Sequence, residues 1–199
     1  MSAPEGPLVG VLALQGDFEA HERTLDSLGA RPRLVRTRED LLGLEALVLP
    51  GGESTTMSLG IERERLAGPL RELIAAGTPV LGTCAGLIML DREHLGAMDI
   101  RAERNAFGRQ SRSFETDVEL AGIAGGPVHA VFIRAPWIAE HGTDVEVLGT
   151  VDGHAVAARQ RRILVVAFHP ELSGERRLHQ WLLDQVQLAP VLPDSALPG

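Results

Sequence analysis

Short apolar runs alternate with amphipathic stretches through the first half of the chain. Leu8 to Leu14, Glu45 to Leu49 and Pro79 to Leu81 are largely apolar, and each run is followed by a segment that contains glycine. Such runs are typical of strands that are buried on both faces of a parallel sheet. Apolar residues recur at helical spacing from Phe18 to Leu28, and Pro69 to Ala76 also reads as a helix. This alternation of strand and helix predicts an α/β fold whose parallel sheet is covered on both faces.

The second half of the chain has a different pattern, in which short strand candidates are separated by turns that contain glycine. These candidates are Phe114 to Leu120, Val128 to Ile133, Val145 to Val151 and Ala155 to Arg159, followed by a last buried run from Ile163 to Phe168. Gly174 to Leu188 has the apolar stripe of a final amphipathic helix. We therefore predict one domain over residues 1–188, whereas residues 189–199, with three prolines and a glycine, predict a flexible tail.

Composition narrows the classes of protein that fit this pattern. The chain has 199 residues and a net charge of −8, which argues against nucleic-acid binding because phosphate contacts need a surplus of Lys and Arg. Its single cysteine excludes an internal disulfide and a multi-cysteine zinc site. No apolar run is long enough to span a membrane, and the N-terminus lacks the pattern of a secretory signal. These features predict a cytoplasmic enzyme or binding protein.

The single cysteine lies in the segment Gly82-Thr83-Cys84-Ala85-Gly86, between a predicted strand and a predicted helix. This is the Gly-x-nucleophile-x-Gly pattern of a nucleophile elbow, with cysteine at the nucleophile position. Glycine on each side lets backbone segments approach closely at a sharp turn. The turn would place the sulfur at the N-terminal end of the next helix, which favours the reactive thiolate. A lone cysteine is most often a small buried apolar residue, but the elbow favours Cys84 as a nucleophile.

A cysteine nucleophile needs a base and a group that orients the base. His169 follows the last buried run, in the tripeptide His169-Pro170-Glu171. In an extended segment the side chains of His169 and Glu171 point to the same side, so Glu171 is expected to fix the imidazole tautomer. The same tripeptide would also fit a strand end with a surface carboxylate. A zinc deaminase is excluded, because the sequence lacks the Pro-Cys-x-x-Cys motif.

A third candidate is the glycine-rich loop Pro50-Gly51-Gly52-Glu53-Ser54, which follows the run that ends at Leu49. Backbone N–H groups of such a loop can bind an anion. The loop lacks the lysine of a P-loop, so a nucleotide is not expected. It is expected to supply an oxyanion donor opposite the N–H of Ala85, with Ser54 as the N-cap of the next helix. A plain turn followed by an N-cap would give the same sequence.

The three motifs are part of a set of six segments that are spread over most of the chain. The segments are residues 10–16 (GVLALQG), 49–57 (LPGGESTTM), 82–88 (GTCAGLI), 103–110 (ERNAFGRQ), 132–136 (FIRAP) and 168–172 (FHPEL). Together they resemble the class I (triad) glutamine amidotransferases, and within that class the glutaminases of pyridoxal 5′-phosphate synthase. The cysteine elbow and His-Pro-Glu are shared by the whole class, whereas the Gly-Gly-Glu-Ser-Thr-Thr, Arg-Asn-Ala-Phe-Gly-Arg-Gln and Phe-Ile-Arg-Ala-Pro segments resemble this one family specifically.

The resemblance implies an α/β three-layer sandwich with a mixed, mostly parallel central sheet flanked by helices. It also implies a triad in which Cys84 is the nucleophile, His169 is the base and then the acid, and Glu171 is the orienting carboxylate. L-Glutamine would be held by Gly52, Glu53, Ser54, Arg104, Ile133 and Arg134, and the oxyanion by the N–H groups of Gly52 and Ala85. Acidic and basic side chains suit this substrate, because free glutamine carries an ammonium and a carboxylate.

The implied reaction is hydrolysis of L-glutamine to L-glutamate and ammonia, which passes to the separate lyase subunit of pyridoxal 5′-phosphate synthase. The resemblance implies no cofactor and no metal. One departure is that the segment between Leu90 and Arg104 is several residues shorter than in the family, which concerns a loop and not the triad. Two other functions fit the same residues. One is a cysteine hydrolase or peptidase that acts without a partner, and the other is a regulatory module that senses glutamine without cleaving it.

Overall fold

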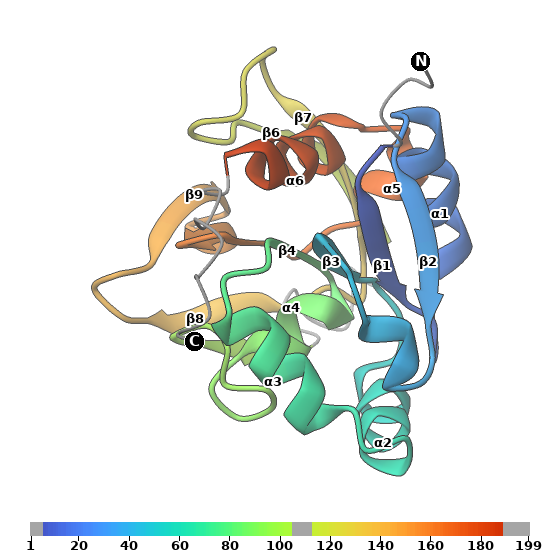
Figure 1. The fold of residues 1–199 in the computed structure, drawn as a ribbon. Helices are drawn as coiled ribbons and strands as arrows, with labels where there is room; N and C mark the ends of the chain where they lie inside the picture. Colours follow the sequence, from blue (N-terminus) through green and yellow to red (C-terminus); the bar gives the residue numbers. More distant parts are fainter. Residues whose placement is uncertain (1–5, 105–112, 189–199) are drawn as a thin grey trace, which may run out of the picture.

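The computed structural model of the chain describes residues 6–104 and 113–188 (Figure 1). The predicted tail, residues 189–199, lies outside the described residues, as do residues 105–110 of the family-like segment that begins at Glu103. A mixed sheet forms the middle of the part that is described. Its strands are β1 (Leu8–Leu12), β2 (Arg31–Val35), β3 (Ala46–Leu49), β4 (Val80–Thr83), β5 (Ile100–Glu103), β8 (Trp137–His141), β9 (Glu146–Val151), β10 (His154–Gln160) and β11 (Ile163–Val166).

The strand order in this sheet is β2-β1-β3-β4-β11-β10-β8-β5, and β9 also pairs with β10. The first five strands in that order are parallel, and the remaining pairs are antiparallel. The chain runs from β1 outward to β2 and then continues on the other side of β1 through β3 and β4. In open α/β sheets, ligands bind outside the carboxyl ends of the strands at such a change of direction. The topology therefore predicts a ligand site at the loops that follow β1 and β3.

Helices cover both faces of the sheet (Figure 1). The helices of the described ranges are α1 (Phe18–Ser27), η1 (Glu39–Leu41), α2 (Ser54–Arg63), α3 (Ala67–Ala75), α4 (Ala85–Leu90), α5 (Pro170–Ser173) and α6 (Arg177–Gln187). α1 and α6 lie together on one face, where the ring centroids of His21 and His179 are 5.0 Å apart, and α2, α3 and α4 lie on the other. None of these helices is long and apolar enough to cross a membrane. The predicted three-layer α/β sandwich with a mixed, mostly parallel sheet is thus confirmed.

The core beneath the strand-to-helix turn at Cys84 is continuous and aliphatic. Every residue of β3, β4 and β11 is buried, and so are all six residues of α4. α4 has no polar side chain, because its sequence is Ala-Gly-Leu-Ile-Met-Leu. Full burial of one large aliphatic side chain contributes about 1.5–3 kcal/mol to folding. The elbow is therefore fixed by the most stable part of the molecule.

A separate hairpin extends the fold beside the end of β11. It consists of β6 (Ser113–Val118) and β7 (Val128–Ile133), which pair antiparallel. The backbone N–H of His169 donates to the carbonyl of Val131 at 2.9 Å, and the ring of Phe132 packs edge-on against Phe168 with centroids 5.5 Å apart. These contacts hold the end of β7, with Ile133 and Arg134, next to His169.

Candidate active site

A cavity of about 470 Å³ lies where the loops after β1, β3, β4 and β11 meet the end of the hairpin. Every predicted site residue except Glu171 lines it: Gly52, Glu53, Ser54, Cys84, Ala85, Arg104, Ile133, Arg134 and His169. Gln15, Asp17, Thr55, Ile88 and Pro136 also line the cavity, and none of them was predicted as a site residue. Gln15 and Asp17 follow β1, whose carboxyl end adjoins that of β3. The parallel strand order is therefore the signal that would have found them.

Cys84 has the backbone conformation of a nucleophile elbow. Its φ of 48° and ψ of −103° lie in a region that non-glycine residues rarely adopt, and it directly precedes α4. The turn is close-packed, because a Cβ on Gly86 would overlap the carbonyl oxygen of Leu49, and a Cβ on Gly82 would lie 2.7 Å from Leu90. The backbone N–H of Cys84 donates to the carbonyl of Val166 at 2.8 Å. The elbow glycines therefore have the packing role that the sequence predicted.

His169 lies between the cysteine and a buried carboxylate. Its Nδ1 is 2.7 Å from Oε1 of Glu171, whose side chain is fully buried. Burial by itself would lower the pKa of His169, but its hydrogen bonds with Cys84 and Glu171 outweigh burial and raise that pKa to about 10. The imidazole is thus held in its protonated form beside Cys84.

The conformation predicted for His-Pro-Glu was wrong, although the contact is present. The tripeptide is not extended: His169 is the N-cap of α5, Pro170 is its first residue, and Glu171 lies in its first turn. Proline is well suited to that position, because its fixed φ fits the helix and its missing N–H would have no partner there. The first turn of the helix brings the carboxylate back toward the imidazole of the N-cap residue.

The loop after β3 presents an anionic side chain to the cavity. Glu53, not Ser54 as predicted, is the N-cap of α2, and its carboxylate accepts from the N–H groups of Thr55 at 3.0 Å and Thr56 at 2.7 Å. The hydroxyl and N–H of Thr56, followed by the N–H of Thr55, hold the pKa of Glu53 at about 2. The longer glutamate reaches the free N–H groups of the first turn, so Ser54 becomes the first helical residue.

Two glycines of the same loop are required by close contacts. A side chain on Gly51 would overlap the ring of His169, and one on Gly52 would meet Oε1 of Gln15, which accepts from the N–H of Glu53 at 2.5 Å. The loop therefore passes directly beside the histidine and is tied to the segment after β1.

Arg104 is held at the cavity by a small hydrogen-bond network. Its guanidinium donates to Oγ1 of Thr55 at 3.1 Å and to Nε2 of His94 at 3.3 Å. Nδ1 of His94 is 2.7 Å from Oδ1 of Asp91, which is 1% exposed and also accepts from the backbone N–H of Glu93. Arginine only donates and a carboxylate only accepts, so the His94 proton lies on Nδ1. The short segment between Leu90 and Arg104 thus closes on Asp91 and positions the arginine.

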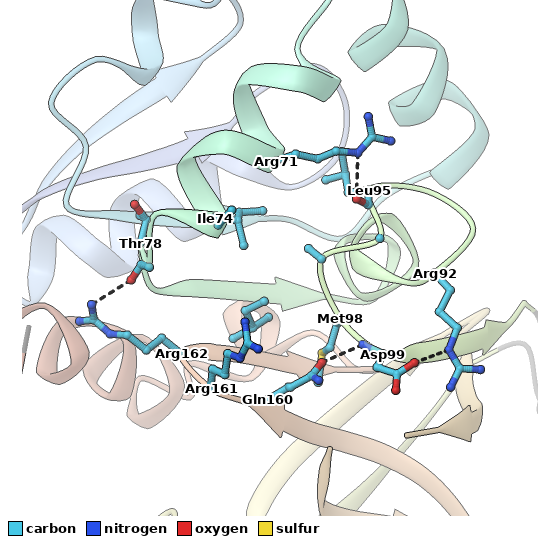
Figure 2. A pocket seen from close by; sticks show the side chains of 15 residues that line it. Arg71, Ile74, Thr78, Arg92, Leu95, Met98, Asp99, Gln160, Arg161 and Arg162 are labelled. Carbon is cyan, nitrogen blue, oxygen red and sulfur yellow. Dashed lines mark hydrogen bonds and ion pairs between the residues drawn. The ribbon is translucent and has the colours of Figure 1, made fainter. Parts of the chain in front are cut away.

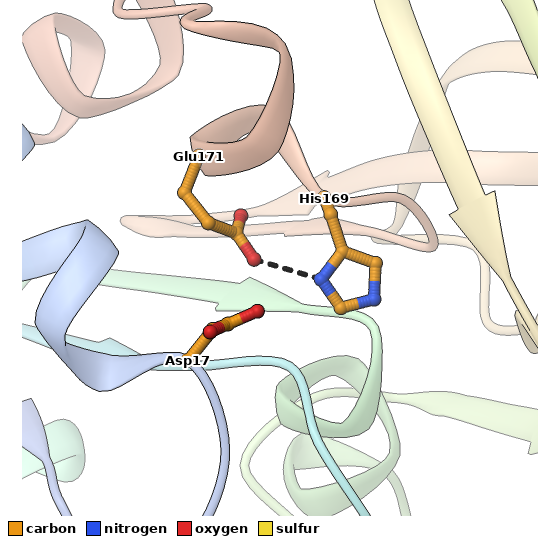
Figure 3. Close-up of side chains that lie close together, drawn as sticks. All are labelled: Asp17, His169 and Glu171. Atoms are coloured by element: carbon orange, nitrogen blue, oxygen red, sulfur yellow. Dashed lines mark hydrogen bonds and ion pairs between the residues drawn. The ribbon is translucent and has the colours of Figure 1, made fainter.

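Asp17 adds a second carboxylate beside the His169–Glu171 pair (Figure 3). One ligand atom from each of these three side chains lies within 4.8 Å of the others, so the group is close enough to surround one ion. The His169 nitrogen nearest to Glu171 is already engaged in the 2.7 Å contact, however, and an ion would have to replace that bond. The geometry is that of an oriented imidazole, and the expectation of no metal stays a prediction.

A second cavity, of about 560 Å³, lies near the amino ends of β4 and β11 and contains no part of this machinery (Figure 2). Several of the arginines that line it are paired within the chain: Arg71 donates to the carbonyl of Leu95 at 2.9 Å, and Arg92 to Asp99 at 2.6 Å. The cavity with Cys84 is therefore the better candidate for chemistry, although it is the smaller one.

A cysteine on an elbow, paired with an imidazole that a buried carboxylate orients, forms thioesters with acyl compounds. Glu53 and Arg104 place one negative and one positive side chain in the same cavity, an arrangement that suits a ligand with both charges, such as an amino acid. The fold and the site thus define a triad amidohydrolase of the glutamine amidotransferase class. The chain belongs to the SNO glutamine amidotransferase family, whose model matches residues 11–188. Membership confirms the resemblance and the predicted function, which is hydrolysis of glutamine to supply ammonia.

Individual relatives agree with this assignment. Pyridoxal 5′-phosphate synthase subunit PdxT of Frankia casuarinae is 49% identical over 191 residues, which cover 92% of this chain and 96% of the relative. The protein of the same name from Mycobacteroides abscessus is 50% identical over 190 residues, covering 91% and 98%. A crystal structure of a glutamine amidotransferase is 42% identical and covers 90% of this chain and 98% of its own, with a TM-score of 0.84.

Proposed function

We propose that this glutamine amidotransferase hydrolyses L-glutamine to L-glutamate and ammonia with Cys84, His169 and Glu171, and supplies the ammonia for pyridoxal 5′-phosphate synthesis. The observation that carries the proposal is that Cys84 and His169 line one cavity of suitable charge, with the buried carboxylate of Glu171 2.7 Å from Nδ1 of the imidazole. The name shared by the two relatives, pyridoxal 5′-phosphate synthase subunit, supports the link to that synthase.

The first half of the reaction forms a thioester. The Cys84 thiolate attacks the side-chain amide carbon of glutamine, and a carbon–sulfur bond forms. Negative charge moves to the amide oxygen, where the N–H groups of Gly52 and Ala85 are the proposed donors. The His169 imidazolium donates its Nε2 proton to the amide nitrogen, the carbon–nitrogen bond breaks, and ammonia leaves. Glu171 holds the imidazole in the required tautomer throughout.

The second half releases glutamate. Neutral His169 takes a proton from a water molecule, and the resulting hydroxide attacks the thioester carbon. The carbon–sulfur bond then breaks, which returns the thiolate and the imidazolium. One water is consumed and one ammonia is produced for each glutamine, so the enzyme ends the cycle in its starting protonation state.

The α-ammonium and α-carboxylate of glutamine are assigned to the charged side chains of the cavity. Glu53 is suited to the ammonium, because its depressed pKa keeps it ionised at neutral pH. Arg104 and Arg134 are suited to the carboxylate, and Ser54 and the backbone of Ile133 complete the proposed substrate contacts. Arg134 is held with a φ of 46°, so its direction is set by the turn at the end of β7.

The proposed partner is the lyase subunit of pyridoxal 5′-phosphate synthase, to which the ammonia would pass. Residues 1–188 would act as one glutaminase domain, which the continuous hydrophobic core supports. We place the enzyme in the cytoplasm, because a nucleophilic cysteine must stay reduced to react. No metal or cofactor takes part in the proposed reaction.

The proposal is tested by measuring ammonia release from glutamine, with and without the synthase subunit, for the natural chain and for Cys84→Ala. Activity is expected for the natural chain and no activity for the variant. Calorimetry should show that Cys84→Ala still binds glutamine, which controls for misfolding. Turnover that persists in the variant would refute the nucleophile. A natural chain that binds glutamine without any turnover would favour a sensor, and turnover that the partner never changes would favour a hydrolase that acts alone.

A further inference from the structure

A fully buried histidine that the proposed mechanism does not use lies directly behind the triad. His21 belongs to α1 and is 0% exposed. Its Nε2 is 3.4 Å from Oε2 of Glu171 and 3.3 Å from Oγ1 of Thr83. We propose that His21 is a positioning residue that fixes Glu171 by donating a hydrogen bond to the oxygen that does not contact His169. This inference rests on the proposed role of Glu171 and extends it.

The position of each proton in this group follows from the chemistry of the neighbours. Nε2 of His21 faces two oxygens that can accept, the carboxylate of Glu171 and the hydroxyl of Thr83, and a carboxylate only accepts, so we assign the proton of His21 to Nε2. A neutral His21 then has a bare Nδ1, which accepts from Nε2–H of His179 at 2.8 Å. The hydroxyl of Thr83 can accept as well as donate, so it shares the His21 proton. One chain of donors therefore runs from His179 through His21 to Glu171.

Both buried histidines are neutral at the pH of catalysis. Burial, with smaller effects of His179 and His169, holds the pKa of His21 well below its ordinary value. Burial also lowers the pKa of His179 to about 4. Four side chains face His21: His169 and Glu171 at the start of α5, His179 of α6 and Thr83 of β4. Two further carboxylates are near this group, Asp17 just before α1 and Glu175, which acts on His179. His21 thus donates a proton to the carboxylate without adding a charge.

The need for such a donor comes from the burial of Glu171. Its side chain is 0% exposed, and Oε1 is occupied by His169. Among the described residues Oε2 of Glu171 has no closely fitting hydrogen-bond partner, and Nε2 of His21 lies 3.4 Å from it. A buried carboxylate oxygen without a donor is costly, so Glu171 would either take up a proton or turn away. Either change removes the negative charge that supports the His169 imidazolium.

Two substitutions of similar chemistry but different reach test this inference. The amide of His21→Gln extends to the Nε2 position and can still donate to Glu171, whereas the amide of His21→Asn reaches only the Nδ1 position, toward His179. We expect kcat to fall about 10- to 100-fold in His21→Asn and to stay within about threefold of the natural value in His21→Gln. His21→Gln is thus the matched control for His21→Asn, because both place an amide at the same buried position.

The single cysteine provides a readout that needs neither substrate nor partner. Iodoacetamide can alkylate only Cys84, and its rate against pH follows the thiolate. In His21→Asn the thiolate should form at higher pH than in the natural chain, because the imidazolium that stabilises it is weakened. His21→Gln should keep the natural profile.

The outcomes separate the role of His21 from that of the triad. Equal kcat and equal alkylation profiles for His21→Asn and His21→Gln would overturn the inference, even if both variants melt at lower temperature. If Cys84→Ala retains turnover, the proposed mechanism itself fails, whatever His21 does. Nitrogen NMR of the natural chain is a further test that does not depend on a variant that folds. A proton on Nε2 of His21 supports the inference, and a proton on Nδ1 contradicts it.

Discussion

The conformation of Cys84 depends on residues that have no reactive group. Gly86 passes so close to Leu49 that no side chain fits, whereas Gly68 in α3 has open space where its Cβ would be. We expect Gly86→Ala to lower the free energy of unfolding by about 3 kcal/mol and to reduce glutaminase activity strongly. Gly68→Ala is the matched control and should raise the free energy of unfolding by about 0.5–1 kcal/mol without a change in kcat. Urea denaturation measures both, and equal effects of the two substitutions would contradict the close-packed elbow.

The protonation of His169 gives a pH-dependent prediction. Its pKa is raised to about 10, so the imidazolium should persist through neutral pH and be lost only as the pH approaches 10. Glu171→Gln removes a negative charge that favours the protonated form, so the pKa should fall by about 1 unit or more. NMR titration of the imidazole checks this directly. His129 is an internal control, because Asp117 and Glu115 raise its pKa on the hairpin and should continue to do so in the variant.

Sequence reasoning identified the reacting residues but not all of their surroundings. Cys84, His169 and Glu171 were found because local motifs, an elbow and a tripeptide, carry them. His21 was missed because its partners Thr83 and Glu171 are far away in the chain and meet it only through packing of α1 against the end of the sheet. The helical spacing around His21 predicted only that this face of the helix is buried. A contact of that kind has no local signature.

At the scale of elements, the short segment before Arg104 holds the guanidinium that we propose binds glutamine. His94 accepts from Arg104 and is itself held by Asp91. We expect His94→Leu to raise KM for glutamine about tenfold while kcat changes little, since the loss of one hydrogen bond to a charged group affects ground-state and transition-state binding alike. His141→Leu, at an exposed histidine at the end of β8, should leave both constants unchanged. A fall in kcat with KM unchanged would contradict this role.

The buried strands were predicted well, and so were the half-exposed strands β6, β7, β9 and β10, whereas β5 and β8 were not predicted. β3, β4 and β11 are buried at every position, so their continuous apolar runs are visible in the sequence. β5 and β8 were missed because they are short and alternate buried with charged residues. Arg101 and Glu140, for example, pair across them at 2.9 Å on the exposed side. Glu53 was missed as the N-cap of α2 because sequence rules favour the shorter serine that follows it.

At the scale of the whole molecule, the hydrophobic core runs without a break from β1 to α6. We therefore expect residues 1–188 to unfold in one cooperative transition, with calorimetric and van't Hoff enthalpies that agree. A chain that ends after Leu188 should have the same melting temperature and the same kcat as the full chain. Two separate transitions, or a lower melting temperature on removal of residues 189–199, would contradict the prediction of a single domain with a dispensable tail.

Complete burial of α4 limits how this enzyme can be regulated. The amide protons of Ala85–Leu90 are expected to exchange with solvent only when the core itself opens, so the core holds the backbone that carries the sulfur. Any signal from a partner must therefore act on the other walls of the cavity, which are the loop after β3 and the end of the hairpin. An inhibitor of this enzyme would then react with a cysteine whose position is fixed, in a cavity whose other walls can move. Its selectivity would depend on contacts with the movable walls, and its reactivity on Cys84.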